Sequence, residues 1–239
     1  MDEKQGNGIV LICYNNDQLD YTRFAIVAAT YAKKQMKVPV SIITDDGTKG
    51  WMEETHSKEL LDATFDKFIV DNNGVASKRN MRRHMDSPWT EFNAPFYNNT
   101  KHDVFTLTPY ERTLLIDTDY LLCNDFYSYI FDTDEPIALH RYANYVGHEI
   151  PYVNEITLNN AGINHWWSTI VYFDQSEEAR LFFDIWSHVK DNWEYYSLLY
   201  QFPKLLFRTD FCVSIAVHLM NGLNNDDFVH DFLGQPLLN

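Results

Sequence analysis

The chain has 239 residues, of which 45% are hydrophobic and 15% aromatic, and its formal net charge is −15 at pH 7. This size and apolar content suit a protein with a substantial core and exclude an intrinsically disordered one. The charge disfavours non-specific binding to nucleic acid or to an anionic membrane, since both require an excess of Lys and Arg. Three scattered cysteines, an acidic start and no long apolar run predict a reduced, cytoplasmic protein without a membrane anchor.

The first part of the chain alternates between apolar runs and amphipathic stretches. Residues 8–14 predict a buried strand, residues 20–34 a helix capped by Asp20, and residues 38–44 a second strand. Four apolar residues of the helix fall at helical spacing, and we expect them to form its core face: Phe24, Val27, Ala28 and Tyr31. This order favours a right-handed parallel unit of the nucleotide-binding kind.

The next part is less regular. Residues 51–61 predict a weaker helix and residues 67–70 a third short strand, whereas residues 71–101 show no clean period. A loop of that length inside a compact domain is usually functional or mobile. It contains the basic cluster of residues 78–84, which is either a solvated face or a counter-charge for an anionic ligand.

The second half continues the mixture of helices and strands. Residues 126–131 predict a short helix, and residues 136–139 and 166–173 predict strands. A helix over residues 176–193 begins at Ser176 as its N-cap, and another covers residues 209–220, opened by Thr209 and Asp210. The chain is therefore expected to have an α/β fold.

The central feature is residues 113–124, where Asp117 and Asp119 interrupt an apolar run. The apolar residues before them predict a strand buried on both faces, which places the two carboxylates at the rim where open α/β sheets bind ligands. Two such charges need compensation, and Mg²⁺ or Mn²⁺ suits carboxylate oxygens. The alternative is a strand end whose aspartates cap the next element. The second Asp-x-Asp pair, Asp132 and Asp134, is interpreted as a turn.

Residues 107–125, LTPYERTLLIDTDYLLCND, resemble the Asp-x-Asp segment of GT-A fold, glycogenin-like nucleotide-sugar glycosyltransferases. Further segments resemble that family in the same order, namely residues 8–17, 41–46, 167–169, 207–210 and 214–222. The likeness is closest to short bacteriophage-type members. It implies the GT-A (Rossmann-like) fold, a mixed, mainly parallel sheet flanked by helices. It also implies a single domain over residues 1–239, with a nucleotide-binding half at 8–125 and an acceptor-side half at 126–239.

The resemblance implies transfer of a hexose from a nucleotide-diphosphate sugar, with a UDP-sugar favoured, to an unknown acceptor with retention of configuration. The metal, Mn²⁺ or Mg²⁺, would be bound by Asp117, Asp119 and His230. Asp210 would orient the sugar or acceptor in the reaction centre as the catalytic candidate, or cap its helix. The residues expected to bind the nucleotide-sugar are Tyr14, Asn15, Asp45, Lys101, Asp117, Thr118, Trp167, Ser168 and Thr169.

The sequence departs from the family pattern near its end. Relatives follow a late His-Phe-x-Gly-like segment with a lysine, which is missing after His230 here. A catalytically inactive GT-A-fold binding module is therefore one alternative. A haloacid-dehalogenase-type phosphohydrolase is another, although its motif opens the domain and continues with a small residue and Thr rather than Tyr120 and Leu121. The acceptor stays open among glycan, protein and modified DNA, of which DNA would need a basic groove around Arg79 and Arg82.

Overall fold

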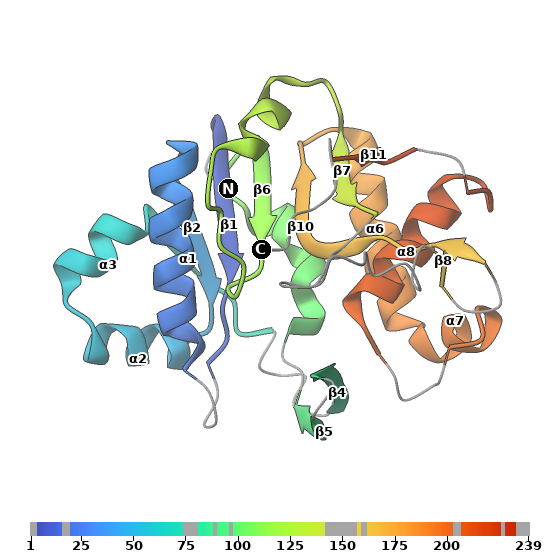
Figure 1. Cartoon of the computed structure of the whole chain (residues 1–239), viewed down its shortest axis with the longest axis horizontal. Helices are drawn as coiled ribbons and strands as arrows, with labels where there is room; N and C mark the ends of the chain where they lie inside the picture. The colour runs from blue at the N-terminus through green and yellow to red at the C-terminus, as the bar shows by residue number, and fades with distance from the viewer. Residues whose placement is uncertain are drawn as a thin grey trace.

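A mixed sheet of seven strands, in the order β11-β7-β10-β6-β1-β2-β3, forms the centre of the structure, which is a computed structural model (Figure 1). The structure describes residues 4–15, 20–73, 81–87, 90–95, 98–141, 157–158, 162–202, 207–225 and 228–232. Neighbouring strands of this sheet run parallel except at β10, which is antiparallel to both β6 and β7. The sheet strands are β1 (Asn7–Ile12), β2 (Val40–Thr44), β3 (Lys67–Val70), β6 (Arg112–Ile116), β7 (Ile137–His140), β10 (Trp167–Phe173) and β11 (His230–Asp231).

Helices cover both faces of this sheet. Its buried residues divide into two apolar clusters, one containing α1 and η2 and the other containing α6, α7 and α8. The helical elements are α1 (Tyr21–Met36), α2 (Asp46–Thr55), α3 (Lys58–Thr64), η1 (Asn98–Asp103), α5 (Val104–Leu107), η2 (Phe126–Asp132), α6 (Glu177–Asp191), α7 (Trp193–Leu199) and α8 (Thr209–Met220). Two short antiparallel pairs complete the described elements: β4 (Met81–Ser87) with β5 (Thr90–Pro95), and β8 (Thr157–Leu158) with β9 (Ile163–Asn164).

The central strand β6 is buried on both faces, as predicted. Leu114, Leu115 and Ile116 are each 0% exposed. Leu114 and Ile116 belong to the cluster with α1, whereas Leu115 belongs to the cluster with α6 and α8. This alternation follows from the two-residue period of a strand and explains the continuous apolar run.

Helix α1 confirms the predicted helix and its cap but not the predicted core face. The Asp20 side chain accepts a hydrogen bond from the Thr22 N–H at 3.1 Å. Phe24, Val27 and Tyr31 point outward and are 43%, 46% and 45% exposed. The residues that pack on the sheet are mostly small, and they include Ala25, Ala28, Ala29 and Ala32. Small side chains let the helix axis approach the strands closely, so the alanines form the buried face.

The predicted helix over residues 51–61 is two helices. The backbone at His56 is extended, and the Ser57 side chain caps α3 by accepting from the Leu60 N–H at 3.2 Å. The described parts of residues 71–101, predicted as a loop, include the β4/β5 pair and the start of η1. None of the described helices is long and apolar enough to cross a membrane.

Candidate functional site

Most of the predicted site residues meet at one edge of the sheet. Because β10 is antiparallel, its first residues lie where β6 and its parallel neighbours end. The Asp117 N–H donates to the Thr169 carbonyl at 3.0 Å, which joins the Asp-x-Asp turn to the start of β10. The predicted residues at this edge are Tyr14 and Asn15 after β1, Asp45 after β2, Asp117 and Thr118 after β6, and Trp167, Ser168 and Thr169 in β10.

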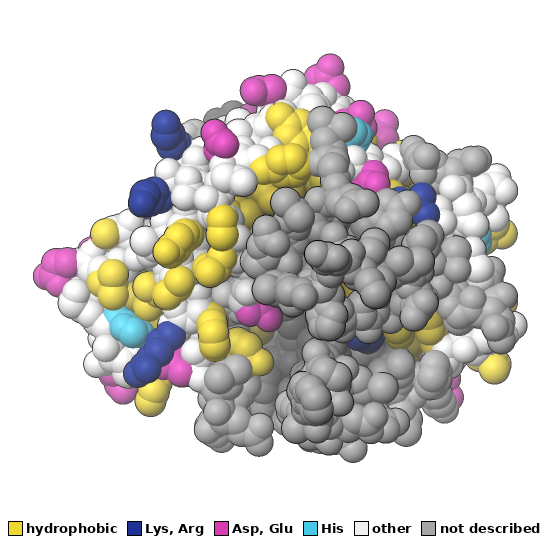
Figure 2. Space-filling view, viewed as in Figure 1, with side chains coloured by type: hydrophobic (Ala, Val, Ile, Leu, Met, Phe, Trp, Pro, Cys, Tyr) yellow, Lys and Arg dark blue, Asp and Glu magenta, His cyan; other side chains and the backbone are white. Residues whose placement is uncertain are grey.

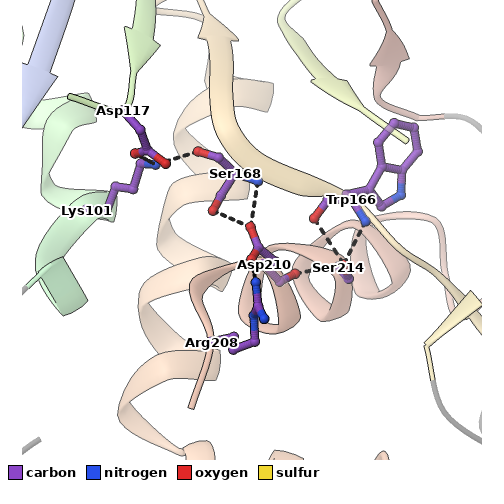
Figure 3. Close-up of polar contacts among 7 residues, drawn as sticks. All are labelled: Lys101, Asp117, Trp166, Ser168, Arg208, Asp210 and Ser214. Carbon is purple, nitrogen blue, oxygen red and sulfur yellow. Dashed lines mark hydrogen bonds and ion pairs between the residues drawn. The ribbon is translucent and has the colours of Figure 1, made fainter. Parts of the chain in front are cut away.

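Lys101 links the Asp-x-Asp turn to β10 (Figure 3). It comes from η1, is 3% exposed, and donates from Nζ to Asp117 Oδ1 and to the Ser168 carbonyl, both at 2.5 Å. Burial raises the pKa of the Asp117 carboxyl to about 6, although 31% of the side chain is exposed. The nearby charge of Lys101 lowers this pKa, but its effect is smaller than that of burial. Nearby Asp119 raises that pKa further. The turn carries two carboxyl groups, Asp117 and Asp119, beside the single ammonium of Lys101, and this excess of acidic groups favours binding of another cation.

Asp210 holds the start of β10 from below (Figure 3). It is 8% exposed, and its Oδ1 accepts hydrogen bonds from Ser168 N–H at 2.9 Å and Ser168 Oγ at 2.6 Å. Arg208 Nη2 lies 3.3 Å from Asp210 Oδ2. Burial alone would raise the pKa of Asp210, but Arg208, His165 and the Ser168 hydrogen bonds hold it well below its ordinary value. Both oxygens of Asp210 thus have protein partners, and its predicted catalytic role stays a prediction.

The helix-cap alternative for Asp210 is wrong. The N-cap of α8 is Arg208, which makes no side-chain cap hydrogen bond, and Asp210 lies inside the first turn. Ser214 extends the contact to β10, since its Oγ donates to the Asp210 carbonyl at 2.7 Å and accepts from the Trp166 N–H at 2.8 Å. A chain of contacts therefore runs from Asp117 through Lys101 and Ser168 to α8.

We expect Asp210→Asn to lower the free energy of unfolding by about 3 kcal/mol at pH 7, because it removes one charge of a buried pair. A carboxyl whose folded pKa lies below its unfolded value of about 4 stabilises the fold above that value. The difference between wild type and variant should therefore be constant from pH 7 to about 5 and shrink as the pH falls below about 4. Urea unfolding of both proteins across this range measures it. A difference that grows on acidification would contradict the assignment.

A second set of hydrogen-bonded polar side chains lies at the ends of β1, β2 and β3. The Asn15 N–H donates to Thr48 Oγ1 at 2.8 Å, and both Asp45 oxygens accept from Thr48, at 2.9 and 2.8 Å. Asp45 thus caps α2, and its contact to a ribose or base stays a prediction. The Tyr14 hydroxyl donates to Asp71 Oδ2 at 3.4 Å. The sequence interpretation missed Asp71, which is buried directly after β3 and follows the same strand-end pattern as Asp45.

A hydrogen-bonded chain of two tyrosines and a histidine contacts the turn at the Asp117 carbonyl and was also missed. The Tyr120 N–H donates to the Asp117 carbonyl at 3.1 Å, and its hydroxyl lies 3.4 Å from that of Tyr127. The Tyr127 hydroxyl lies 2.8 Å from His140 Nε2 at the end of β7. Burial lowers the pKa of His140 to about 4, so the ring is neutral at pH 7.

The three predicted metal ligands do not come together. Asp119 is exposed on the turn after Asp117. His230 lies on β11, three strands away from β6 in the sheet order, and its Nδ1 is 3.7 Å from Glu135 Oε1. Among the described residues, no group of three or more His, Cys, Asp or Glu is placed to hold a metal ion. The segment after residue 232 and residues 78–80 of the basic cluster lie outside the described residues.

Comparison with known proteins identifies the fold. No protein-family model and no curated protein sequence matches the chain. The galactosyltransferase LgtC, solved with donor and acceptor sugar analogues, superposes with a TM-score of 0.52 at 12% identity, over 88% of this chain and 70% of that one. The chain has the GT-A glycosyltransferase fold.

Two further structures agree with this fold. An active-site variant of LgtC gives a TM-score of 0.54 at 11% identity, over 94% of this chain and 72% of that one. The glycosyltransferase GlyE of Streptococcus pneumoniae gives 0.51 at 8% identity, over 96% of this chain and 46% of that one. The glycogenin-like and bacteriophage-type subtypes stay predictions.

Proposed function

We propose that this protein is a metal-dependent glycosyltransferase that moves a hexose from a nucleotide-diphosphate sugar, with a UDP-sugar favoured, to an acceptor. The observation that carries the proposal is the Asp-x-Asp turn at the rim, where Lys101 joins Asp117 to the Ser168 carbonyl. The GT-A fold supports it, since LgtC, a galactosyltransferase of the same fold, was solved with donor and acceptor sugar analogues. Retention of configuration belongs to the same proposal.

The carboxylates of Asp117 and Asp119 fit Mn²⁺ or Mg²⁺. Such ions are commonly held by one or two protein carboxylates and complete their shell with phosphate oxygens and water, so the proposal does not need His230. The two carboxyl groups of the turn outnumber the one lysine beside them, which favours a dication there. When bound, the ion would act as a Lewis acid that stabilises the leaving diphosphate.

The remaining residues at this edge of the sheet have separate roles in the proposed reaction. Lys101 supplies a fixed positive charge beside the diphosphate, which partly replaces the lysine missing after His230. Trp167, Ser168 and Thr169 lie at the start of β10, where the sugar of the donor would rest. Asp210 keeps this strand start in place through its two hydrogen bonds to Ser168. Tyr14 and Asn15 lie at the end of β1, where the nucleoside would bind.

A thermal-shift panel of nucleoside diphosphates and nucleotide-sugars, with and without Mn²⁺, tests this function. At a hundred times its dissociation constant a ligand stabilises by about 2.7 kcal/mol, which raises the unfolding midpoint by about 5 to 10 °C for a chain of this size. We expect a Mn²⁺-dependent shift with one diphosphate family. No shift with any of them in a folded protein would overturn the donor site. Release of the sugar from the stabilising donor distinguishes the enzyme from an inactive binding module.

A further inference from the structure

A cavity of about 350 Å³ opens at the outer edge of the sheet, beside β11 and its neighbour β7. We call it the β11 cavity. Acidic, basic and histidine side chains gather over these two strands, at the upper right of Figure 2. The residues that line the cavity are Glu135, Arg141, Val229, His230 and Asp231. A cavity of this size holds a small ligand, and the donor site proposed above uses none of these residues.

The β11 cavity adjoins the proposed donor site. His140 is the register partner of Trp167, so β7 reaches the rim beside the strand start where the donor sugar would rest. Arg141 follows His140, and its guanidinium carbon lies 5.4 Å from the ring centroid of Trp166. Trp166 lies two residues before Ser168 on the same strand start (Figure 3). A ligand in the cavity is therefore a close neighbour of the donor sugar.

The lining of the cavity offers hydrogen-bonding groups of both kinds. The carboxylates of Glu135 and Asp231 accept, the guanidinium of Arg141 donates, and the imidazole of His230 can do either. Val229 is 1% exposed, so the wall presents little apolar surface. A hydroxyl group both donates and accepts, and its hydrogen bonds to charged groups are stronger than those to neutral ones. The lining thus suits a ligand that carries several hydroxyl groups.

His230 has hydrogen-bonding capacity that the protein does not use. Its Nδ1 lies 3.7 Å from Glu135 Oε1, whereas its buried Nε2 has no hydrogen-bond partner within the described part of the chain. A buried polar atom without a partner is destabilising. The side chains of His230 and Glu135 are nevertheless 26% and 43% exposed, so this pair can be reached from the cavity. An unsatisfied polar group in the wall favours occupation by a polar ligand.

The charge of the lining limits the class of ligand further. Two carboxylates stand against one guanidinium, in a chain whose net charge is −15, which disfavours phosphate groups, nucleic acid and carboxylated sugars. A metal ion does not fit, since the described residues include no group of three or more His, Cys, Asp or Glu placed to hold one. A neutral sugar satisfies both the charge and the hydrogen-bonding groups of the cavity.

We propose that the β11 cavity is the acceptor subsite and takes a neutral, hydroxyl-rich sugar, with Glu135 as a specificity-determining residue. This inference rests on the proposed function, because it assigns the acceptor of that reaction. Of the three acceptor classes left open by the sequence, it selects a glycan.

NMR titrations with methyl glucoside and methyl galactoside, each compared with the methyl uronide of the same sugar, test this subsite. The uronide differs by a carboxylate in place of the C6 hydroxymethyl group. We expect wild type to bind at least one neutral hexoside, and to bind it about fivefold or more tightly than its uronide. Glu135→Gln should raise the dissociation constant of the neutral sugar about tenfold, because a charged acceptor is lost. Glu135→Lys should reverse the preference, so that the uronide binds more tightly.

Glu53→Gln is the matched control. The Glu53 carboxylate also lies 3.7 Å from a side-chain nitrogen, that of Lys49, but it belongs to α2 and does not line the cavity. This variant should bind the hexosides as wild type does. Equal weakening in Glu53→Gln and Glu135→Gln, or an unchanged preference in Glu135→Lys, would overturn the assignment of Glu135.

The donor panel described above separates this inference from the proposed function. A Mn²⁺-dependent donor shift in a protein that binds neither hexoside would overturn the sugar subsite and keep the glycosyltransferase. Binding of the hexosides without any donor shift would overturn the glycosyltransferase and keep the cavity as a sugar site. Glu135-dependent binding of a peptide containing Ser and Thr, in place of the hexosides, would overturn the glycan as the acceptor.

Discussion

Replacing Asp119 by alanine is expected to lower metal-dependent sugar transfer by about three orders of magnitude, because loss of one metal carboxylate removes several kcal/mol of charge stabilisation from the leaving diphosphate. The unfolding midpoint should barely change. Asp119 is exposed on the turn, and exposed substitutions usually alter stability by less than about 0.5 kcal/mol. Initial rates over a Mn²⁺ titration, with the donor found by the thermal-shift panel, give the comparison.

Asp134→Ala is the matched control for this experiment. Asp134 is the second aspartate of the other Asp-x-Asp pair, is exposed, and follows the end of η2 rather than a buried strand. Its loss should leave both the rate and the Mn²⁺ dependence unchanged. Full activity of Asp119→Ala would remove the metal site from the turn. Equal losses in the two variants would mean that the effect comes from net charge and not from the site.

The sequence predicts best those elements whose residues are apolar because the element is buried in the core. The strands β1, β2, β6 and β10 and the helix α8 lie where continuous or periodic apolar runs predict them. Four of the five residues of β6 and nine of the twelve of α8 are buried, so the apolar run itself predicts the element. The rim location of Asp117 follows in turn from the direction of β6, since a parallel strand ends where ligands bind.

Prediction from the sequence fails where the buried face of a helix or the partner of a side chain is set by residues far away in the sequence. In α1 the bulky Phe24, Val27 and Tyr31 form the stronger periodic pattern, but the alanine face is the one that fits against the sheet. The contact between Lys101 and Ser168 spans 67 positions, and that between Ser168 and Asp210 spans 42. No local pattern encodes such pairs. The contact of Asp210 with Ser168 is of this kind, whereas the catalytic role of Asp210 stays a prediction.

Replacing Lys101 by methionine is expected to destabilise the metal-free protein and to strengthen its response to Mn²⁺ alone. Breaking a buried ion pair costs about 3 to 5 kcal/mol, and because 31% of the Asp117 side chain is exposed we expect about 2 kcal/mol. This corresponds to a fall of about 4 to 8 °C in the unfolding midpoint. A dication at the turn replaces the lost charge, so Mn²⁺ should restore part of the midpoint. In wild type the Lys101 ammonium, 2.5 Å from Asp117 Oδ1, would repel a dication held by this carboxylate and so oppose its binding.

Lys33→Met is the control variant, because it shows whether the changed response to Mn²⁺ is specific to Lys101 or follows the loss of a lysine elsewhere. Lys33 pairs with Asp66 at 2.9 Å, but the side chains are 34% and 39% exposed, so the variant should lose less than about 1 kcal/mol and respond to Mn²⁺ as wild type does. The nucleoside diphosphate gives the opposite readout, because without Lys101 it loses a fixed counter-charge. Its Mn²⁺-dependent shift should therefore shrink in Lys101→Met while the shift with Mn²⁺ alone grows. If the two shifts change in the same direction, Lys101 serves only the stability of the fold.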